Sequence, residues 1–192
     1  MVHGRREWGL GVTMIFLDMD GVLCDFAGGV CALFGKDAPQ AGDLAQELHQ
    51  HLGIAKGLMW SRIAEAGARL WEGLEPLPWA DELVALVRSH GELVIATAPS
   101  LNPASLAGKL TWLQRRFGRN FRDFVVTPQK HLLAAPGRIL IDDSPRHVDA
   151  FSAFGGLSTL FPSIENGLLR PDQDPVMDLR NWLKQTDRPA AE

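Results

Sequence analysis

The sequence predicts an α/β protein in which helices cover both faces of a parallel sheet. Apolar runs typical of buried strands alternate along the chain with stretches of helical periodicity, as in consecutive βαβ units. Three of these runs end directly in carboxylate or hydroxyl side chains, which places polar groups at the sheet edge where open α/β sheets bind ligands. A chain of 192 residues, 46% of them hydrophobic, is long enough for one full core with a modest insertion.

The first strand is expected at residues 14–17 and is followed by a helical insertion. Residues 27–72 contain several stretches with helical spacing of apolar residues, among them the segment 57–70. Pro76 and Pro78 then break the chain and return it to the sheet. We therefore expect a small helical cap between the first strand and the rest of the core.

The strand and helix alternation continues after the insertion. Asn102 followed by Pro103 favours a helix start, and Leu106, Leu110 and Leu113 predict the apolar stripe of that helix. The remaining expected elements are a helix at 80–90, strands at 92–97, 123–127 and 138–142, a helix at 145–154, a weak strand at 158–161 and a terminal helix at 176–186.

These elements together predict a Rossmann-like core with one inserted cap. Residues 12–26 and 73–192 are expected to form the core, and residues 27–72 the cap. Residues 1–11 carry charge and glycine and are expected to be frayed or disordered.

Composition excludes several classes of partner. The net charge of -4 gives no general attraction to duplex nucleic acid or to an anionic membrane, and no apolar run is long enough to span one. Cys24 and Cys31 are the only cysteines and are not spaced as a Cys-x-x-Cys pair, which favours a reducing cytoplasm. The sequence leaves a homodimer open.

Two carboxylates follow the first strand with one residue between them. Asp18 and Asp20 can begin on one face because the side-chain period of a strand is two, and Gly21 permits a tight turn after them. Converging carboxylates repel unless a cation or a shared proton intervenes, and a hard divalent ion such as Mg²⁺ prefers oxygen ligands. The alternative for this pair is a solvated strand end.

The segment Asp18-Met19-Asp20-Gly21-Val22 resembles the first motif of the haloacid dehalogenase superfamily. That resemblance implies that Asp18 is a nucleophile toward phosphorus and that Asp20 is a general acid and base. Three more segments follow in the order of the family's motifs and end in Thr97, in Lys130 and in the pair Asp142 and Asp143. By the same resemblance, Thr97 and Lys130 hold phosphoryl oxygens, and the acidic pair completes the metal site.

Lys130 and the pair Asp142 and Asp143 also have explanations that involve no catalysis. A lone lysine such as Lys130 is usually a solvated surface charge, and an Asp-Asp pair after a strand can cap the following helix. Neighbouring side chains diverge, so the sequence alone does not decide whether Asp142 or Asp143 contacts the metal.

The chain resembles, more narrowly, the 5′(3′)-deoxyribonucleotidases. The matching segments are Asp18–Phe26, Leu74–Pro78, Thr97–Pro99, Thr127–Lys130 and Leu140–Asp143. This resemblance favours Asp143 as the direct metal ligand, with the backbone carbonyl of Asp20 as another. Ala98 stands where the family has a serine that donates a hydrogen bond to the phosphate.

The same resemblance predicts aromatic contacts to a nucleobase. Phe26 lies where the family's phenylalanine stacks on the base, and Trp60 and Trp71 lie in the cap that should roof the site. All three side chains have the alternative of being ordinary core residues.

Three functions are compatible with these observations. The first is a Mg²⁺-dependent phosphatase of nucleoside monophosphates that forms an aspartyl-phosphate. The second is a phosphatase of another small metabolite, such as a sugar phosphate, on the same core. The third is a non-catalytic binding module, disfavoured because every motif position holds a chemically competent residue. A hydrolysis panel of nucleotides and sugar phosphates discriminates among them.

Overall fold

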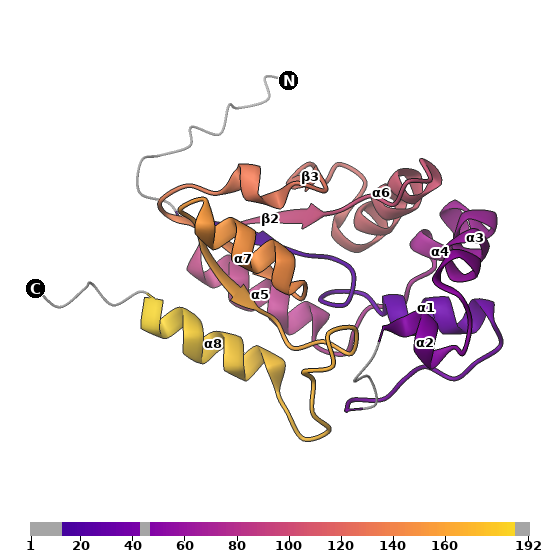
Figure 1. Cartoon of the computed structure of the whole chain (residues 1–192). Helices are drawn as coiled ribbons and strands as arrows, with labels where there is room; N and C mark the ends of the chain where they lie inside the picture. The colour runs from indigo at the N-terminus through magenta and orange to yellow at the C-terminus, as the bar shows by residue number, and fades with distance from the viewer. Residues whose placement is uncertain (1–12, 43–46, 187–192) are drawn as a thin grey trace, which may run out of the picture.

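The computed structural model describes residues 13–42 and 47–186 and contains a five-stranded parallel sheet (Figure 1). The strand order is β3-β2-β1-β4-β5. The strands are β1 (Met14–Leu17), β2 (Glu92–Thr97), β3 (Phe124–Val126), β4 (Arg138–Asp142) and β5 (Leu157–Leu160). In the central register, Ile15 pairs with Leu93 on one side and Ile139 on the other. The predicted parallel sheet is confirmed, whereas the expectation of a frayed end at 1–11 lies outside the described residues.

Helices cover both faces of the sheet, as predicted. One face carries α5 (Ala80–His90), α6 (Ala104–Phe117) and α8 (Pro175–Thr186). The other face carries the 3-10 helix η1 (Lys130–Leu133) and α7 (Pro145–Ala153). Side chains of β1 alternate between the faces, so Ile15 and Leu17 enter the larger core while Phe16 packs edge-on against Phe151 of α7.

The insertion after β1 is helical and gathers at the end of the sheet toward which β2 points, beside α6 (Figure 1). Its helices are α1 (Phe26–Leu33), α2 (Leu48–His51), α3 (Lys56–Ala66) and α4 (Ala68–Glu72). The expected stretch 57–70 is divided between α3 and α4, because Gly67 has a φ of 60° and ends α3. A left-handed conformation of this kind favours glycine.

The predicted apolar stripe of α6 is wrong at one position. Leu106 is 43% exposed, whereas the buried face of the helix runs through Ser105, Lys109, Trp112 and Leu113. Gly108 sets this rotation, because a Cβ there would collide with the backbone of α4 and with Trp71. The helix therefore approaches the cap closely and turns a lysine inward.

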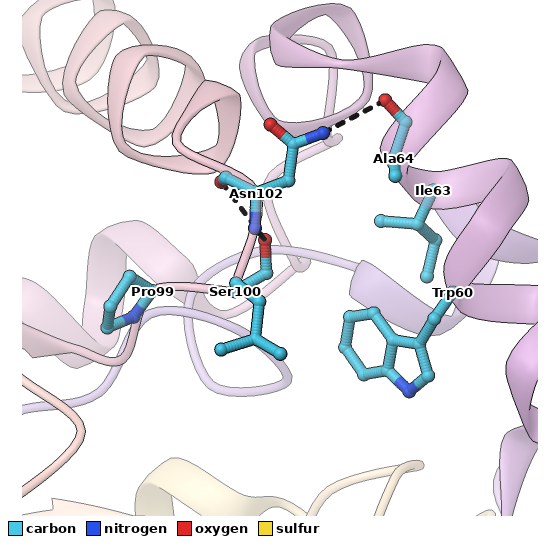
Figure 2. A pocket seen from close by; sticks show the side chains of 7 residues that line it. Trp60, Ile63, Ala64, Pro99, Ser100 and Asn102 are labelled. Atoms are coloured by element: carbon cyan, nitrogen blue, oxygen red, sulfur yellow. Dashed lines mark hydrogen bonds between the residues drawn. The ribbon is translucent and has the colours of Figure 1, made fainter.

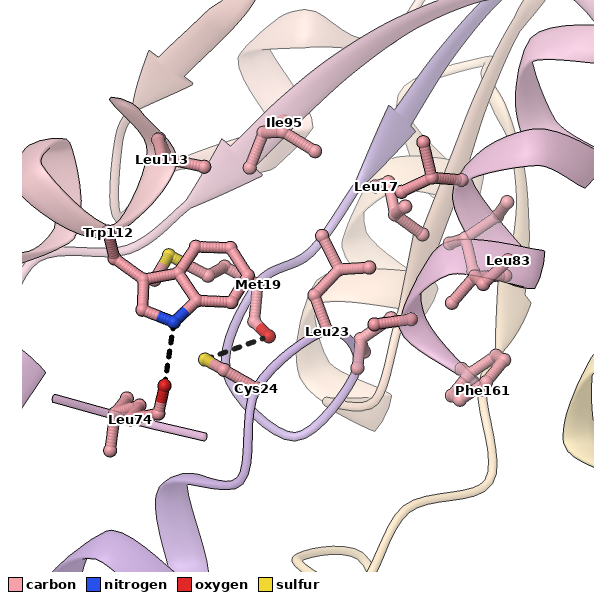
Figure 3. Close-up of a cluster of buried hydrophobic side chains, with 14 of the residues drawn as sticks. Leu17, Met19, Leu23, Cys24, Leu74, Leu83, Ile95, Trp112, Leu113 and Phe161 are labelled. Atoms are coloured by element: carbon pink, nitrogen blue, oxygen red, sulfur yellow. Dashed lines mark hydrogen bonds between the residues drawn. The ribbon is translucent and has the colours of Figure 1, made fainter. Parts of the chain in front are cut away.

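A buried cluster lies beneath the loop that follows β1 (Figure 3). Met19, Leu23 and Cys24 are fully buried, and the Met19 carbonyl accepts hydrogen bonds from the Leu23 and Cys24 amides at 2.8 and 3.0 Å. Trp112 of α6 donates its indole N–H to the Leu74 carbonyl at 2.8 Å. These buried side chains and hydrogen bonds fix the loop and so restrain the carboxylates of Asp18 and Asp20.

Candidate active site

Side chains from the ends of three adjacent strands line a cavity of about 270 Å³ at the carboxyl edge of the sheet. The predicted site residues that line it are Asp18, Asp20, Phe26, Trp60, Trp71, Ala98, Lys130 and Asp143. Thr97 and Asp142, also predicted, have no exposed surface and lie behind this lining. The parallel order brings these residues together because β1 has β2 on one side and β4 on the other.

The turn after β1 sets the direction of its carboxylates. The Asp18 amide continues the sheet by donating to the Ile141 carbonyl at 2.9 Å, and Gly21 then takes a φ of 72°. A Cβ at Gly21 would collide with the carboxylates of Asp143 and Glu165. Glycine is therefore required here both for the turn and for the space that it leaves.

Lys130 is buried between two carboxylates. Its Nζ lies 2.6 Å from Asp18 Oδ1 and 2.5 Å from Asp142 Oδ2, and only 1% of its side chain is exposed. Burial acts to lower the pKa of Lys130, but the charges of Asp18 and Asp142 outweigh it and raise that pKa. The alternative of a solvated surface lysine is wrong.

Asp142 is held on both oxygens by protein groups. Besides Lys130, it accepts hydrogen bonds from the Ser144 amide at 2.9 Å and from His147 Nδ1 at 3.3 Å. Burial acts to raise the pKa of Asp142, yet the bonds from His147 and Lys130 prevail and lower it. This carboxylate holds Lys130 in place.

Asp143 stands in a different environment on the cavity wall. Burial, together with the charges of Asp18 and Glu165, holds the pKa of its carboxyl well above the usual range, although Ser163 Oγ donates to it at 2.8 Å. Burial and the charge of Asp142 likewise raise the pKa of Asp18 to about 6. The charge of Lys130 acts to lower the pKa of Asp18 but does not outweigh these contributions.

The acidic residues fit a divalent cation. Asp18, Asp142 and Asp143 each offer an oxygen atom, and these atoms all lie within 4.8 Å of one another. Crowded carboxylate oxygens with raised pKa values are the donors that a hard ion prefers, and its charge would relieve their repulsion. Because Asp142 is already engaged by Lys130 and His147, Asp18 and Asp143 are the better placed direct ligands.

A second buried lysine, which the sequence reasoning missed, pairs with Asp20. Lys109 Nζ lies 2.5 Å from Asp20 Oδ2, 2.8 Å from Thr97 Oγ1 and 2.6 Å from the Ala98 carbonyl. The Asp20 side chain is therefore directed to Lys109. A sequence signal existed, since Lys109 precedes Trp112 and Leu113 by three and four residues and so shares their helix face.

Glu165 is a further residue of the cavity wall that the sequence reasoning did not single out. It follows β5, and its Oε1 accepts a hydrogen bond from the Ala27 amide in the first turn of α1 at 3.0 Å. Burial, with smaller contributions from Asp25 and Asp20, raises the pKa of Glu165 to about 7. No pattern in the sequence marks this glutamate.

The three predicted aromatic residues form one cluster, in which Phe26 stacks on Trp71 and is tilted against Trp60. Phe26 lies 5.3 Å from Trp71 at an interplanar angle of 17°, and 6.5 Å from Trp60. Lys109 Nζ lies 4.8 Å from the Trp71 ring, so this tryptophan is covered by Phe26 and Lys109 and is only 3% exposed. Trp60 is 40% exposed. Phe26 and Trp60 therefore offer more open surface to a ligand than Trp71 does.

A second, apolar cavity of about 380 Å³ adjoins the first (Figure 2). In Figure 2, Trp60 and Ile63 of α3 face Pro99 and Ser100 across it, and Asn102 joins the two sides by donating to the Ala64 carbonyl at 3.1 Å. Trp60, Pro99 and Ser100 line both cavities, so space continues from the carboxylates toward an apolar region.

Comparisons with known proteins give matches over most of the chain. A family model described as "5' nucleotidase, deoxy (Pyrimidine), cytosolic type C protein" matches residues 12–170. The mitochondrial 5′(3′)-deoxyribonucleotidase of Homo sapiens is 30% identical over 93% of this chain and 86% of its own length. Its Mus musculus counterpart is 29% identical over 88% of this chain and 80% of its own length.

Solved structures resemble the whole fold at low identity. A haloacid dehalogenase-like hydrolase of Xanthomonas campestris gives a TM-score of 0.51 at 17% identity, over 94% of this chain and 97% of that one. A Bacillus subtilis hydrolase of the same superfamily, described as bound to magnesium, gives a TM-score of 0.54 at 14% identity, over 90% and 98%. These likenesses confirm the predicted fold. Among the described residues, no helix has both the length and the apolar character needed to cross a membrane.

Proposed function

The chain belongs to the cytosolic type C family of deoxy (pyrimidine) 5′ nucleotidases and is a hydrolase of phosphoric monoesters. We propose that it is a Mg²⁺-dependent nucleoside monophosphate phosphatase. The observation that carries the proposal is the position of Asp18. Its carboxylate lines the cavity, and one of its oxygens is held at 2.6 Å from Lys130. A carboxylate fixed in this way can attack phosphorus with its other oxygen.

In the first step, an Asp18 oxygen forms a bond to phosphorus while the bond to the nucleoside oxygen breaks. The product is an aspartyl-phosphate, so that one difficult displacement becomes two easier ones. Asp20 supplies a proton to the leaving oxygen. Lys130, which lines the cavity, stabilises the phosphoryl oxygens as negative charge develops on them. The family resemblance gives the Thr97 hydroxyl, which lies behind that lining, a share in this role.

In the second step, water hydrolyses the aspartyl-phosphate. Asp20 takes a proton from the water as its oxygen bonds to phosphorus, and the electron pair of the broken bond returns to Asp18. General acid and base assistance of this kind accelerates a reaction by roughly 10²–10⁴. The same carboxyl serves both steps because it gives its proton in the first and regains one in the second.

Asp18 and Asp143 would hold the magnesium ion, with the Asp20 backbone carbonyl as a further ligand. When bound, the ion offsets the repulsion between the nucleophile and the phosphate. Asp142 contributes indirectly, because its bonds to Lys130 and His147 fix the lysine beside Asp18.

Phe26 and Trp60 support a substrate that carries an aromatic base. Both side chains line the acidic cavity, and Trp60 also borders the apolar one. The free thiols of Cys24 and Cys31, both buried, support a cytoplasmic setting. Ala98 favours the second candidate, a phosphatase of another small metabolite, because it removes a hydroxyl from the phosphate side of the site.

The test combines one substitution with a substrate panel. Asp18→Asn should abolish turnover of deoxynucleoside monophosphates and leave the melting temperature near that of wild type, because an amide fills the same space but does not attack phosphorus. Asp81→Asn is the matched control, since that carboxylate is 91% exposed on α5 and is not among the residues that line the cavity. Turnover should also stop in excess chelator and return with Mg²⁺.

Two results would contradict the proposal. A folded Asp18→Asn variant within tenfold of the wild-type rate would show that the nucleophile is another residue. Full activity in excess chelator would show that the reaction does not require a metal ion. A wild-type preference for sugar phosphates over every nucleotide would select the second candidate.

A further inference from the structure

We propose that Lys109 is a positioning residue, which holds Asp20 in place for the hydrolysis of the aspartyl-phosphate. The inference rests on the proposed function, because it gives Asp20 the role of proton acceptor. It concerns a residue of α6 whose ammonium group lies 2.5 Å from Asp20 although the two are 89 positions apart in the chain.

The hydrogen bonds of Lys109 identify it as a positioning group. A lysine ammonium has three N–H donors. Three acceptors lie within hydrogen-bonding distance of this one, namely Asp20 Oδ2, Thr97 Oγ1 and the Ala98 carbonyl. No donor is left for a phosphate, which separates Lys109 from Lys130.

Burial makes this arrangement rigid. The Lys109 side chain is 1% exposed, and a charge removed from water is tolerated only when it is paired and hydrogen-bonded. The ring of Trp71 covers the ammonium at 4.8 Å, and Gly108 lets α6 come close enough to α4 for that contact. Lys109 is thus fixed by the cap on one side and by the loop after β2 on the other.

Asp20 bridges this buried group and the cavity. Its side chain is 26% exposed and lines the cavity, while its Oδ2 atom is held by Lys109. Its Oδ1 atom makes a long contact, 3.7 Å from the Cys24 thiol. The geometry therefore leaves Oδ1 as the atom that receives the proton of the attacking water.

The same contact orients the Thr97 hydroxyl. Because Thr97 Oγ1 accepts from Lys109, its own hydrogen is free to be donated elsewhere. Thr97 has no exposed surface, so this hydrogen bond fixes its hydroxyl behind the cavity lining. One ammonium thus sets the direction of two groups of the site.

The experiment separates the two steps by the choice of substrate. 4-Nitrophenyl phosphate has a leaving group that departs without a proton, so kcat/KM reports formation of the aspartyl-phosphate and kcat also includes its hydrolysis. Lys109→Met should lower kcat by about 100-fold, as loss of acid-base assistance does. It should change kcat/KM by less than about tenfold, because the Asp18 nucleophile is untouched. A burst of nitrophenolate should then appear, approaching one equivalent per enzyme.

Two further variants control the result. Arg115→Met removes another basic side chain of α6, one that binds Glu72 of the cap at the surface, and should behave as wild type. The double variant Asp20→Asn/Lys109→Met should be no slower than Asp20→Asn alone, because the lysine acts through the carboxylate.

Three outcomes would overturn the inference. The first is an unchanged kcat, and the second is a parallel loss of kcat and kcat/KM without a burst, as a structural role predicts. The third is failure of both Lys109→Met and Lys109→Gln to fold, judged by circular dichroism and melting temperature. Failure of the proposed function is distinguishable, because Asp20→Asn would then retain activity.

Discussion

Replacing Glu165 by glutamine should stabilise the metal-free protein, and the gain should depend on pH. Glutamine resembles the protonated acid in shape and charge, and its oxygen can still accept the hydrogen bond that the Ala27 amide donates at 3.0 Å. What the substitution removes is the cost of ionising a buried glutamate that also lies near Asp25 and Asp20.

The magnitude follows from the pKa of Glu165, which burial raises from 4.5 to about 7. A carboxyl whose pKa is higher in the folded state contributes stability below pH 4.5 that is lost as pH rises through 7. At about 1.36 kcal/mol per pKa unit, the full loss is about 3 kcal/mol, which residual exposure reduces to about 1–2 kcal/mol. For a chain of this size, that corresponds to a rise of roughly 3–6 °C in melting temperature.

The assay is thermal unfolding in excess chelator at pH 5 and pH 8. Glu165→Gln should melt above wild type at pH 8 and show a much smaller difference at pH 5. Glu65→Gln, an exposed change of the same charge on α3, should show no such pH dependence. A Glu165→Gln variant that is equal to or less stable than wild type at pH 8 would refute the reasoning.

Two further predictions concern the proposed reaction. Lys130→Met should reduce kcat by about 10²-fold or more, because it removes the cation held at 2.6 Å from Asp18, and steady-state kinetics with Mg²⁺ would contradict this if the rate stayed within tenfold. Phe26→Ala should raise KM for nucleoside monophosphates by about tenfold to a hundredfold, the equivalent of a lost base stack of roughly 1–3 kcal/mol. A small aryl phosphate should lose much less, and equal losses on both substrates would show that Phe26 only supports Trp71.

The sheet and its helices could be predicted from the sequence because their signals are local. Apolar runs, helical spacing and proline breaks act within a few residues, so the element types and approximate bounds follow from short windows. The gathering of Asp18, Thr97 and Lys130 also followed, since parallel strands deliver their carboxyl ends to one edge of a sheet. The deoxyribonucleotidase resemblance rested on the same segments.

The tertiary structure alone decided how the charges pair. Lys109 pairs with Asp20, 89 positions away in the chain, and Glu165 pairs with Ala27, 138 positions away. At such sequence separations, the spacing of residues does not predict which side chains meet. The orientation of α6 could not be predicted from a local pattern either. The face through Leu106 and the face through Lys109 are related by a rotation of only part of a turn about the helix axis. Packing of Gly108 against the cap selected the face through Lys109. The free-energy cost of burying this lysine is small because Asp20 and Thr97 accept its hydrogen bonds.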